Sequence, residues 1–422
     1  DGHRALSMRE RSSSWAGLHA WWGMMALMDT GLLLHLCAPV TWRMALAAGC
    51  LAPPSLFTDG FVHLSTSAQV RLPANALYAG RTDLLMLLID PARVPGELRF
   101  EAGEHDARSG LRFPHHYGAL PTSAVVAVLP YPPGPDGHFP DPVGLPAPDD
   151  HRARVRLFDR SLAVRRAAAL VPVAGGVAVL DPRFPASYEH NTLWIDHTAD
   201  AATVIAEAAR VLGGAALTHR RVVLHDPVTV RALASHGWSV QELRLLAWDQ
   251  TRRAPQSSTV RPVVHETVSR LWERSWRRDL PDVEDETIRQ LLDREPLTDV
   301  VLRLINLAVL DPHGEPIASA QLRIDGATAA IEAVMTDPAH QRTGLARMLV
   351  LHAIAQAHTA GCDVIFLASA ADDWPRHWYT RLGFTEVHTR YEATQTDAPA
   401  SPTNPEGQRI TSPQTDPRNA RS

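Results

Sequence analysis

Short apolar runs alternate with longer amphipathic stretches along the chain, and this pattern predicts a mixed α/β protein, of the α/β or α+β class. In the first part, apolar runs at Leu32–Cys37, Leu84–Ile89 and Val125–Leu129 predict strands, and Thr41–Ala48 predicts a helix. Many residues of the third run are β-branched, and such residues favour extended backbone. Together these elements predict a first folded unit over residues 32–130.

A stretch rich in proline and glycine follows this unit. It opens with Pro130-Tyr131-Pro132-Pro133-Gly134-Pro135, and further proline, glycine and aspartate residues continue to Asp150. Proline fixes φ and lacks a backbone N–H donor, so it is poorly suited to helix interiors and central strands. The stretch therefore predicts an extended linker over residues 131–151.

From residue 152 to residue 394, strands and helices alternate in two passages of similar order. The first passage predicts a strand pair at Val171–Leu180, a helix at Asp200–Leu212, a strand at Val222–Leu224, a helix at Val228–Ser235 and a strand at Leu243–Trp248. The second predicts strands at Ile317–Ile324 and Ala329–Met335, a helix at Gly344–Ala360, a strand at Asp363–Leu367, a helix at Trp374–Arg381 and a strand at Glu386–Tyr391. Both end in strand, helix, glycine-aromatic pair and strand. The likeness indicates either an internal duplication, with parts at 152–250 and 251–394, or a chance repeat of a common α/β order.

The two ends of the sequence differ from the rest in composition. The run Trp21–Val40 is apolar enough to suggest a signal peptide, but Asp29 and His35 interrupt it, and it is too broken to span a bilayer. We therefore expect a loose extension over residues 1–31 and a cytoplasmic protein. Residues 395–422 contain almost no apolar side chains, which predicts a disordered tail.

Composition narrows the function classes. The 422 residues include 46 acidic and 41 basic side chains, a formal net charge of -5, so no general affinity for nucleic acid or an anionic membrane is expected. The three cysteines, Cys37, Cys50 and Cys362, are too few for a disulfide framework and too scattered for a metal cluster. We expect reduced thiols and no metal site.

The segment Ile331–Val350 carries the most specific chemistry. Its predicted strand ends at Met335, and Gln341-Arg342-Thr343-Gly344-Leu345-Ala346 then opens a long amphipathic helix. Free N–H groups in a first helical turn attract anions, and the helix dipole adds a favourable partial charge. Gly344 and Ala346 leave that turn bare, and Arg342 can add a full positive charge. The loop predicts a pyrophosphate site; an ordinary strand-to-helix turn is the alternative.

At these residues the chain resembles the GNAT (GCN5-related N-acetyltransferase) family. Gln341, Gly344 and Ala346 match the family's cofactor motif, and Trp378-Tyr379-Thr380-Arg381-Leu382-Gly383-Phe384 matches its Tyr-x-x-Leu-Gly-Phe segment. The resemblance implies a GNAT fold and acetyl-CoA as co-substrate. It implies that Tyr379 protonates the departing thiolate, unless this tyrosine only packs in the core. The cofactor contacts we expect come from Val334, Met335, Gln341, Arg342, Thr343, Gly344, Leu345, Ala346 and Asp372.

Two features leave the site incomplete. Asp372 stands where many members of the family have asparagine, and an ionised carboxylate accepts hydrogen bonds but cannot donate them. The acceptor amine must also lose a proton before it attacks, and Glu332 is our candidate base, unless it faces solvent or pairs with an arginine. The earlier passage matches neither GNAT motif, so it predicts a degenerate GNAT-like half without cofactor.

Other polar groups are candidates for the acceptor site. Glu266, Glu273 and Asp279 lie with two tryptophans in the segment where the GNAT family usually builds its acceptor pocket, and they would suit a cationic amine. An exposed amphipathic helix is the alternative. The polar run Tyr188-Glu189-His190-Asn191 precedes a strand of the earlier passage and either borders the acceptor site or belongs to the scaffold.

Four segments of the first unit resemble the bacterial domain-of-unknown-function family 952. They read LLHLCAPVTWRMALAAG, SLFTDGFVHLST, ANALYAGRTDLLMLLIDP and RFPHHYGALPTSAVVAVLP, and they occur in the order and at the spacing of that family. The resemblance implies an ADP-ribosyltransferase-like mixed domain with a cleft. It does not imply an activity.

Polar residues in these segments form a candidate ligand site. They are His35, His63, Ser65, His115 and Tyr117. If the domain handles NAD, His35 would contact the ribose and a tyrosine, Tyr78 or Tyr117, would stack on the nicotinamide, with Glu101 as a candidate acid. A metal site formed by His63, His115 and His116 lacks a recognisable motif. The alternative is that these histidines are ordinary core residues.

Three functions follow from these features. The first is an N-acetyltransferase that acts on an amine of a small molecule or peptide and carries an accessory N-terminal domain. The second is a binding module that senses acyl-CoA or NAD without turnover. The third is a bifunctional protein whose N-terminal domain transfers ADP-ribose. The sequence does not identify the acceptor, nor does it fix the oligomeric state.

Overall fold

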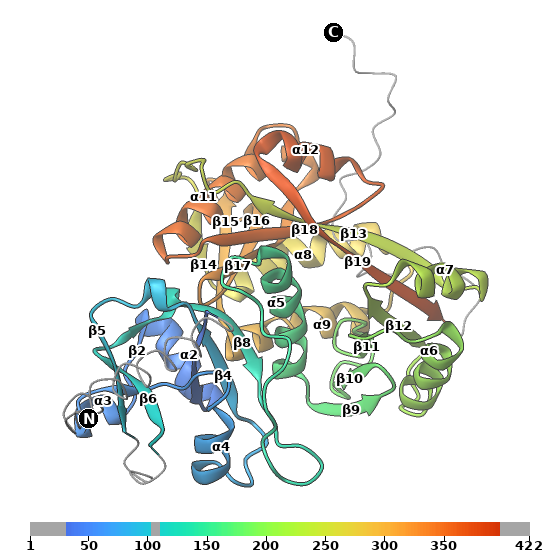
Figure 1. The fold of residues 1–422 in the computed structure, drawn as a ribbon. Helices are drawn as coiled ribbons and strands as arrows, with labels where there is room; N and C mark the ends of the chain where they lie inside the picture. The colour runs from blue at the N-terminus through green and yellow to red at the C-terminus, as the bar shows by residue number, and fades with distance from the viewer. Residues whose placement is uncertain (1–30, 103–109, 397–422) are drawn as a thin grey trace, which may run out of the picture. The chain divides into compact units, whose positions relative to one another are not determined.

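A computed structural model describes residues 31–102 and 110–396 of the chain. It divides into two compact units, residues 1–154 and residues 155–422, and the boundary falls within helix α5 (His151–Arg166). Each unit has its own sheets and its own buried core (Figure 1). None of the helices in the described residues has the length and apolar character needed to cross a bilayer.

The first unit contains two three-stranded antiparallel sheets. One has the strand order β1-β4-β8, and the other has the order β3-β6-β5. The five residues of β1 and of β4 are all buried, which accounts for their mostly apolar sequences, with His35 the polar residue of β1. The elements of this unit are β1 (Leu33–Cys37), α2 (Pro39–Ala48), β2 (Cys50–Leu51), α3 (Ser55–Thr58), β3 (Val62–His63), α4 (Arg71–Leu77), β4 (Leu85–Ile89), η1 (Pro91–Arg93), β5 (Glu97–Ala102), β6 (Arg112–Tyr117), β7 (Leu120–Pro121), η2 (Thr122–Ala124) and β8 (Val125–Pro130).

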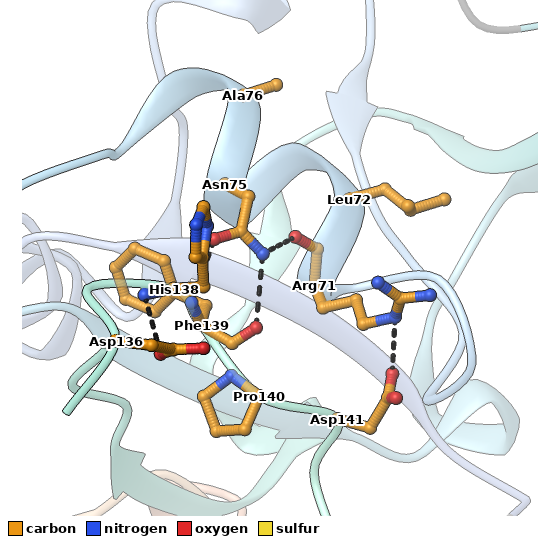
Figure 2. Close-up of a pocket in the computed structure, with 9 residues that line it drawn as sticks. All are labelled: Arg71, Leu72, Asn75, Ala76, Asp136, His138, Phe139, Pro140 and Asp141. Carbon is orange, nitrogen blue, oxygen red and sulfur yellow. Dashed lines mark hydrogen bonds and ion pairs between the residues drawn. The ribbon is translucent and has the colours of Figure 1, made fainter. Parts of the chain in front are cut away.

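The proline-rich segment 131–150 has no helix or strand, but it packs within the first unit. Tyr131 and Phe139 are buried, and their rings lie 5.3 Å apart. Asn75 of α4 exchanges two hydrogen bonds with the backbone of Phe139, at 2.8 and 3.1 Å (Figure 2). The segment is therefore part of the first unit and does not form a free linker, because aromatic burial and these bonds fix its backbone.

The second unit is built on a mixed sheet of eleven strands in the described residues. The strand order is β14-β15-β16-β17-β18-β13-β19-β12-β11-β10-β9. In that order the strands are β14 (Arg261–Val263), β15 (Arg303–Leu310), β16 (Pro316–Asp325), β17 (Thr328–Thr336), β18 (Val364–Ala370), β13 (Ser239–Trp248), β19 (Phe384–Thr396), β12 (His219–Leu224), β11 (Thr192–Ile195), β10 (Gly176–Leu180) and β9 (Ala169–Val173).

The element order of this sheet repeats once. Strands β9, β10 and β11 are followed by α6, β12, α7 and β13, and strands β15, β16 and β17 are followed by α11, β18, α12 and β19. The last strand of each half lies beside a strand of the other half: β13 pairs with β18, and β19 pairs with β12. The predicted boundary at residue 250 therefore does not separate two sheets, because the halves exchange their final strands.

Helices cover both faces of this sheet (Figure 1). The helices α6 (Ala201–Ala208), α7 (Pro227–Ser235), α11 (Leu345–Thr359) and α12 (Trp374–Leu382) pack on one face through apolar side chains. The helices α5, α8 (His265–Asp279), α9 (Asp285–Asp293) and α10 (Pro296–Val301) lie on the other face. The register places buried polar and charged side chains of β16 and β17 on that second face. Two short helical turns, η3 (Ala209–Gly213) and η4 (Pro338–His340), complete the unit.

The observed elements differ from the predicted ones mainly at their ends. Helix α6 ends at Ala208, and the π-type turn η3 continues it, where one helix to Leu212 was expected. The predicted tail begins too early, because Gln395 and Thr396 still pair with β12 at the end of β19. The remaining tail residues and the predicted N-terminal extension, apart from Gly31, lie outside the described residues.

Candidate functional site

The start of helix α11 is a bare, accessible helix N-terminus. Gly344 precedes the helix with φ at 89°, a left-handed conformation that glycine adopts without strain, and no side chain caps the first turn. Arg342, Thr343 and Gly344 are all exposed. The hydroxyl of Thr343 donates to the carbonyl of His340 at 2.5 Å, which turns that side chain away from the helix. The backbone N–H groups are thus left available to an anion.

A β-bulge in β17 shapes the sheet beside this helix. Gln321 pairs with Glu332 and Ser319 pairs with Met335, so β17 carries one more residue than β16 between these pairs. Ala333 in the bulge has a φ of 50°, which is unusual for a residue with a side chain. The parallel pairing of β17 with β18 covers only Thr328–Ala330, and the two strands separate beyond it. The sheet therefore opens at Glu332.

Tyr379 of α12 lies beside this opening. Its side chain is 8% exposed and belongs to the apolar cluster that includes Phe384, whose ring centroid is 5.8 Å from that of Tyr379. Burial raises the pKa of the phenol well above its usual value, and the nearby carboxylates of Glu332 and Asp373 raise it further. Tyr379 is therefore a neutral phenol near Glu332, although one side chain comes from helix α12 and the other from strand β17 of the sheet.

The structure assigns different positions to the two aspartates before α12. Asp372 is exposed. Asp373 caps the helix by accepting a hydrogen bond from the N–H of Trp374 at 2.7 Å, and its pKa is raised by burial. Sequence reasoning singled out Asp372 from the motif position and missed Asp373. The signal that could have identified Asp373 is its place directly before Trp374-Pro375, where a helix cap is expected.

Buried polar side chains line the second face of the sheet next to Glu332. The amide of Gln321 donates to Asn306 at 3.1 Å, and Arg323 donates to Gln321 at 2.9 Å. Farther along β16, the indole N–H of Trp272 on α8 donates to Ser319 at 3.1 Å. Sequence reasoning missed this polar row because alternating polar residues on a strand normally indicate a solvent-exposed face. Here α8 and its neighbours cover that face.

The acids of α8 do not line a pocket. Glu266 and Asp279 are exposed, and Asp279 pairs with Arg278 at 2.8 Å. Glu273 pairs with Arg277 one helical turn away at 3.0 Å. The arrangement in the described residues matches the alternative, an amphipathic helix that buries its tryptophan side and turns its acidic side toward solvent.

The first half of the second unit lacks the corresponding features. Where α11 begins with Gly344, α6 begins with Asp200, whose carboxylate accepts from the N–H of Thr203 at 2.9 Å. This fixed negative charge occupies the position that an anion would need. At the place that Tyr379 holds in α12, four residues before the glycine of the glycine-aromatic pair, α7 has the buried Leu233. At these two positions the described residues therefore supply neither a bare helix start nor a phenol.

In the first unit the structure gathers several predicted residues on one sheet. His63 of β3 pairs with His115 of β6 in the strand register, and their ring centroids lie 5.2 Å apart. The carboxylate of Glu101 on β5 binds both the Nδ1 of His115 at 3.0 Å and the hydroxyl of Tyr117 at 2.7 Å. The hydrogen bond from Tyr117 is the main cause of the lowered pKa of Glu101, and the hydrogen bond from His115 adds to it.

The remaining candidates of the first unit lie in its core. His35 is buried and its Nδ1 is 2.8 Å from the carbonyl of His63; burial lowers the pKa of this histidine. Ser65 is buried, and its backbone exchanges two hydrogen bonds of 2.8 Å with Leu34. His115 and His116 are neighbours on one strand and point to opposite faces of the sheet, so they cannot share a metal ion. Within the described residues no cluster of three potential ligands could hold a metal.

A shallow hollow in the first unit lies between α4 and the proline-rich segment (Figure 2). Arg71 on its wall pairs with Asp141 at 2.8 Å, and Asn75 binds the backbone of Phe139. None of the candidate site residues lines this hollow. Its polar groups hold the segment 131–150 against α4.

Comparison with known proteins gives two family matches. The model described as "Acetyltransferase (GNAT) family" matches residues 265–384, and the model described as "Protein of unknown function (DUF952)" matches residues 36–128. The second description names no activity, so the expectation of an NAD site in the first unit gains no support from it. No curated protein matches the chain.

Solved structures include proteins similar to each part. A GCN5-related N-acetyltransferase from Kribbella flavida is 18% identical, with 59% of this chain and 96% of that chain covered and a TM-score of 0.41. A functionally unknown conserved protein from Staphylococcus epidermidis is 12% identical, with 54% and 93% covered and a TM-score of 0.44. Protein CC0527 from Caulobacter crescentus is 28% identical, with 26% and 93% covered and a TM-score of 0.24.

Proposed function

Because the chain contains an acetyltransferase domain of the GNAT family at residues 265–384 and a DUF952 domain at residues 36–128, we propose that it transfers an acetyl group from acetyl-CoA to an amine of a small molecule or peptide. The GNAT domain implies acyl-CoA as co-substrate and an amine as acceptor. The proposal adds the residues that carry the reaction and assigns the DUF952 domain an accessory role.

The start of α11 supports the cofactor part of the proposal. The pyrophosphate would accept hydrogen bonds from the free N–H groups of the turn Gln341–Ala346, and the helix dipole would favour its charge. The exposed Arg342 would add a charge-assisted contact. From there the thioester arm would run toward the opening between β17 and β18, past Val334 and Met335.

The chemistry divides between two side chains. The neutral amine attacks the thioester carbonyl, and Glu332 accepts the proton that the nitrogen loses. As the C–S bond breaks, Tyr379 donates its phenolic proton to the departing CoA thiolate. Proton return to Tyr379 and proton release from Glu332 then restore the enzyme. The products are an acetylated amine and free CoA.

One observation carries this proposal. The sheet opens at Glu332, and the buried phenol of Tyr379 lies close enough to that carboxylate for its pKa to be raised by it. This arrangement supports the assignment of Glu332 as base and Tyr379 as acid, and the bare start of α11 supports the cofactor site. An apolar core position alone would explain a buried Tyr379, but not a buried carboxylate beside it.

The test is release of CoA thiol from acetyl-CoA in the presence of a panel of amines. Tyr379→Phe and Glu332→Gln should each lower kcat by about 100-fold, the usual range for loss of one acid or base. Tyr391→Phe is the matched control, because Tyr391 is a half-buried tyrosine packed in the core of the first half. No release by the unaltered chain with any amine would end the proposal.

The first half of the second unit serves as scaffold in this proposal. The carboxylate of Asp200 caps α6 where a pyrophosphate would bind, and Leu233 replaces the acid. Its strand β13 completes the sheet beside β18, so it supports the active half without binding a cofactor. We interpret it as a degenerate GNAT-like repeat. One acetyl-CoA should therefore bind per chain, a stoichiometry that calorimetry would measure.

For the first unit the Glu101–His115–Tyr117 group is the best candidate ligand site. A carboxylate that orients an imidazole and a phenol can bind a polar ligand or assist proton transfer. The DUF952 resemblance implies an ADP-ribosyltransferase-like fold, so NAD is the first ligand to test, by thermal shift of the whole chain and of Glu101→Gln. An absence of shift at millimolar NAD would exclude NAD as its ligand and leave the accessory role.

A further inference from the structure

A cluster of buried charges lies on the second face of the sheet, on the side of Glu332 away from the cofactor helix. We define this arginine cluster by its members: Arg166, Glu189, His190, Arg294, Glu295 and Arg323. The exposed fraction of each arginine residue is at most 8%. The members come from both halves of the second unit: the end of α5, the loop before β11, the turn after α9, and β16.

Ion pairs join the cluster in one chain. Glu189 binds Arg166 at 2.8 Å and Arg294 at 3.7 Å. Glu295 binds Arg294 at 3.4 Å and Arg323 at 3.3 Å. Three guanidinium groups thus share two carboxylates along this chain. Buried guanidinium groups need acceptors for their N–H groups, so an anion that adds acceptor atoms would stabilise the cluster.

Three polar nitrogen atoms in the cluster support this reading. The Nε atoms of Arg166 and Arg323 and the Nε2 of His190 are buried and have no hydrogen-bond partner within the described residues. His190 stays neutral, because burial and then the charges of Arg166 and Arg294 lower its pKa well below the usual value. Buried donors of this kind are normally satisfied, so an acceptor placed among these three nitrogen atoms would be stabilised by them.

The cluster is connected to the proposed base. Arg323 donates to Gln321, and Gln321 pairs with Glu332 across the strands β16 and β17. Arg323 is two residues farther along β16, which places its backbone about 7 Å from that of Gln321. An acceptor whose amine meets Glu332 can therefore reach Arg323 with a second group a few bonds away.

We propose that the arginine cluster binds an anionic group of the acceptor, so that the substrate is an amine carrying a carboxylate or a phosphate. This inference rests on the proposed acetyl transfer, since it names the acceptor class of the same site. The alternative is that the cluster only joins the two halves of the unit, as a buried ion-pair network with no ligand.

Matched acceptors separate these two readings. We would measure kcat/KM of the whole chain for glycine and β-alanine against their amides, and for phosphoethanolamine against ethanolamine. The anionic member of at least one pair should be preferred by about ten-fold or more, the usual effect of a charge-assisted hydrogen bond. The pair that shows the preference identifies carboxylate or phosphate. Equal rates within every pair, or a preference for the uncharged members, would overturn the proposal.

Variants locate the effect. Arg323→Gln should raise KM for the preferred anionic amine by about ten-fold and leave KM for acetyl-CoA unchanged; Arg323→Lys should restore part of the loss. Arg165→Gln is the matched control, because Arg165 is equally buried on the same face but pairs with Asp325. If Arg323→Gln leaves the preference intact while the protein stays folded by thermal denaturation, the cluster is a structural network.

The proposal can also fail separately from acetyl transfer. If no amine is acetylated, the proposed function fails, and the anion site is tested by the thermal stability of the unaltered chain. Stabilisation by the anionic amines and not by their uncharged partners would support the site; no difference would overturn it. If Arg323→Gln does not fold, the matched acceptors with the unaltered chain decide the question.

Discussion

Glu332 lies on strand β17 and Tyr379 on helix α12, yet the Glu332 carboxylate contributes to the raised pKa of the Tyr379 phenol, after burial. The bulge at Ala333 and the separation of β17 from β18 make this proximity possible. A carboxylate and a neutral phenol thereby lie near each other, as the proposed base and acid require. This relationship is the basis of the proposed acetyl transfer.

The raised pKa of Tyr379 predicts an unusual pH dependence. An acid acts only while it is protonated, and a phenol whose pKa lies above its ordinary value of 10.0 stays protonated throughout neutral and mildly alkaline solution. We expect kcat to show no decline caused by Tyr379 up to about pH 10. The check is a pH profile of the unaltered chain and of Tyr379→Phe. A decline below that pH that disappears in the variant would contradict the prediction.

Gly344→Asp should weaken acetyl-CoA binding. The new carboxylate would cap α11 as Asp200 caps α6, and it would repel the pyrophosphate. We expect KM for acetyl-CoA to rise by about ten-fold or more, because two negative charges would lie together at the start of the helix. Gly314→Asp is the control: Gly314 also has a positive φ of 84° and open surroundings, but it lies in the turn between β15 and β16. A similar rise in both variants would indicate backbone strain instead.

Substitutions of Ala333 should show whether the bulge matters. Ala333→Gly relieves the positive φ of 50° and should keep activity, with stability unchanged or higher by up to about 1 kcal/mol. Ala333→Val should destabilise the chain by about 1–3 kcal/mol, because a β-branched residue resists this conformation, and it should lower kcat by flattening the opening.

Ala216→Val is the control for strain alone, since Ala216 has a φ of 56° but is exposed in a loop of the first half. Urea denaturation and thiol release would be measured for all three variants. Loss of activity in Ala216→Val equal to that in Ala333→Val would argue against a specific role for the bulge.

His225 should make stability dependent on pH. Burial, followed by the charge of Arg156, lowers its pKa from 6.5 to about 3. Between pH 6.5 and about pH 3, His225 is therefore protonated in the unfolded chain and neutral in the folded chain. The free energy of unfolding should therefore fall as the pH drops below 6.5. We expect this histidine to account for a loss of about 1–2 kcal/mol between pH 7 and pH 5.

The check is urea unfolding at both pH values for the unaltered chain and His225→Asn, which should show a smaller difference between the two. His236→Asn is the control, because His236 is exposed at the end of α7. An equal pH effect in the unaltered chain and in His225→Asn would show that His225 is not responsible.

The sequence predicted local features well where a physical requirement acts over a few residues. Gln341–Ala346 was expected to open a helix with a bare first turn, and the structure shows α11 starting after an accessible Gly344. The strand pair around Gly175-Gly176 was also predicted, and β9 and β10 are joined there. Such features depend on backbone conformation and helix-end chemistry, which nearby residues decide.

Features that depend on long-range packing were not predicted. The acids of α8 were candidates for a pocket, but this helix turns them to solvent, and the buried polar row Asn306–Gln321–Arg323 was overlooked. Alternating polar residues look the same whether solvent or another helix covers a strand. Asp372 was favoured over Asp373 for a related reason: the motif position does not say which carboxylate faces the core.

The sequence by itself therefore determined the two family resemblances, the helix start at Gly344 and the repeated order of elements. Each of them can be recognised from short segments of neighbouring residues. The tertiary structure alone decided that the two halves exchange β13 and β19, that Glu332 and Tyr379 meet at one opening, and that three arginines gather under the second face. These relationships join residues far apart in the chain. They arise from which surfaces are buried together, and no local pattern encodes that pairing.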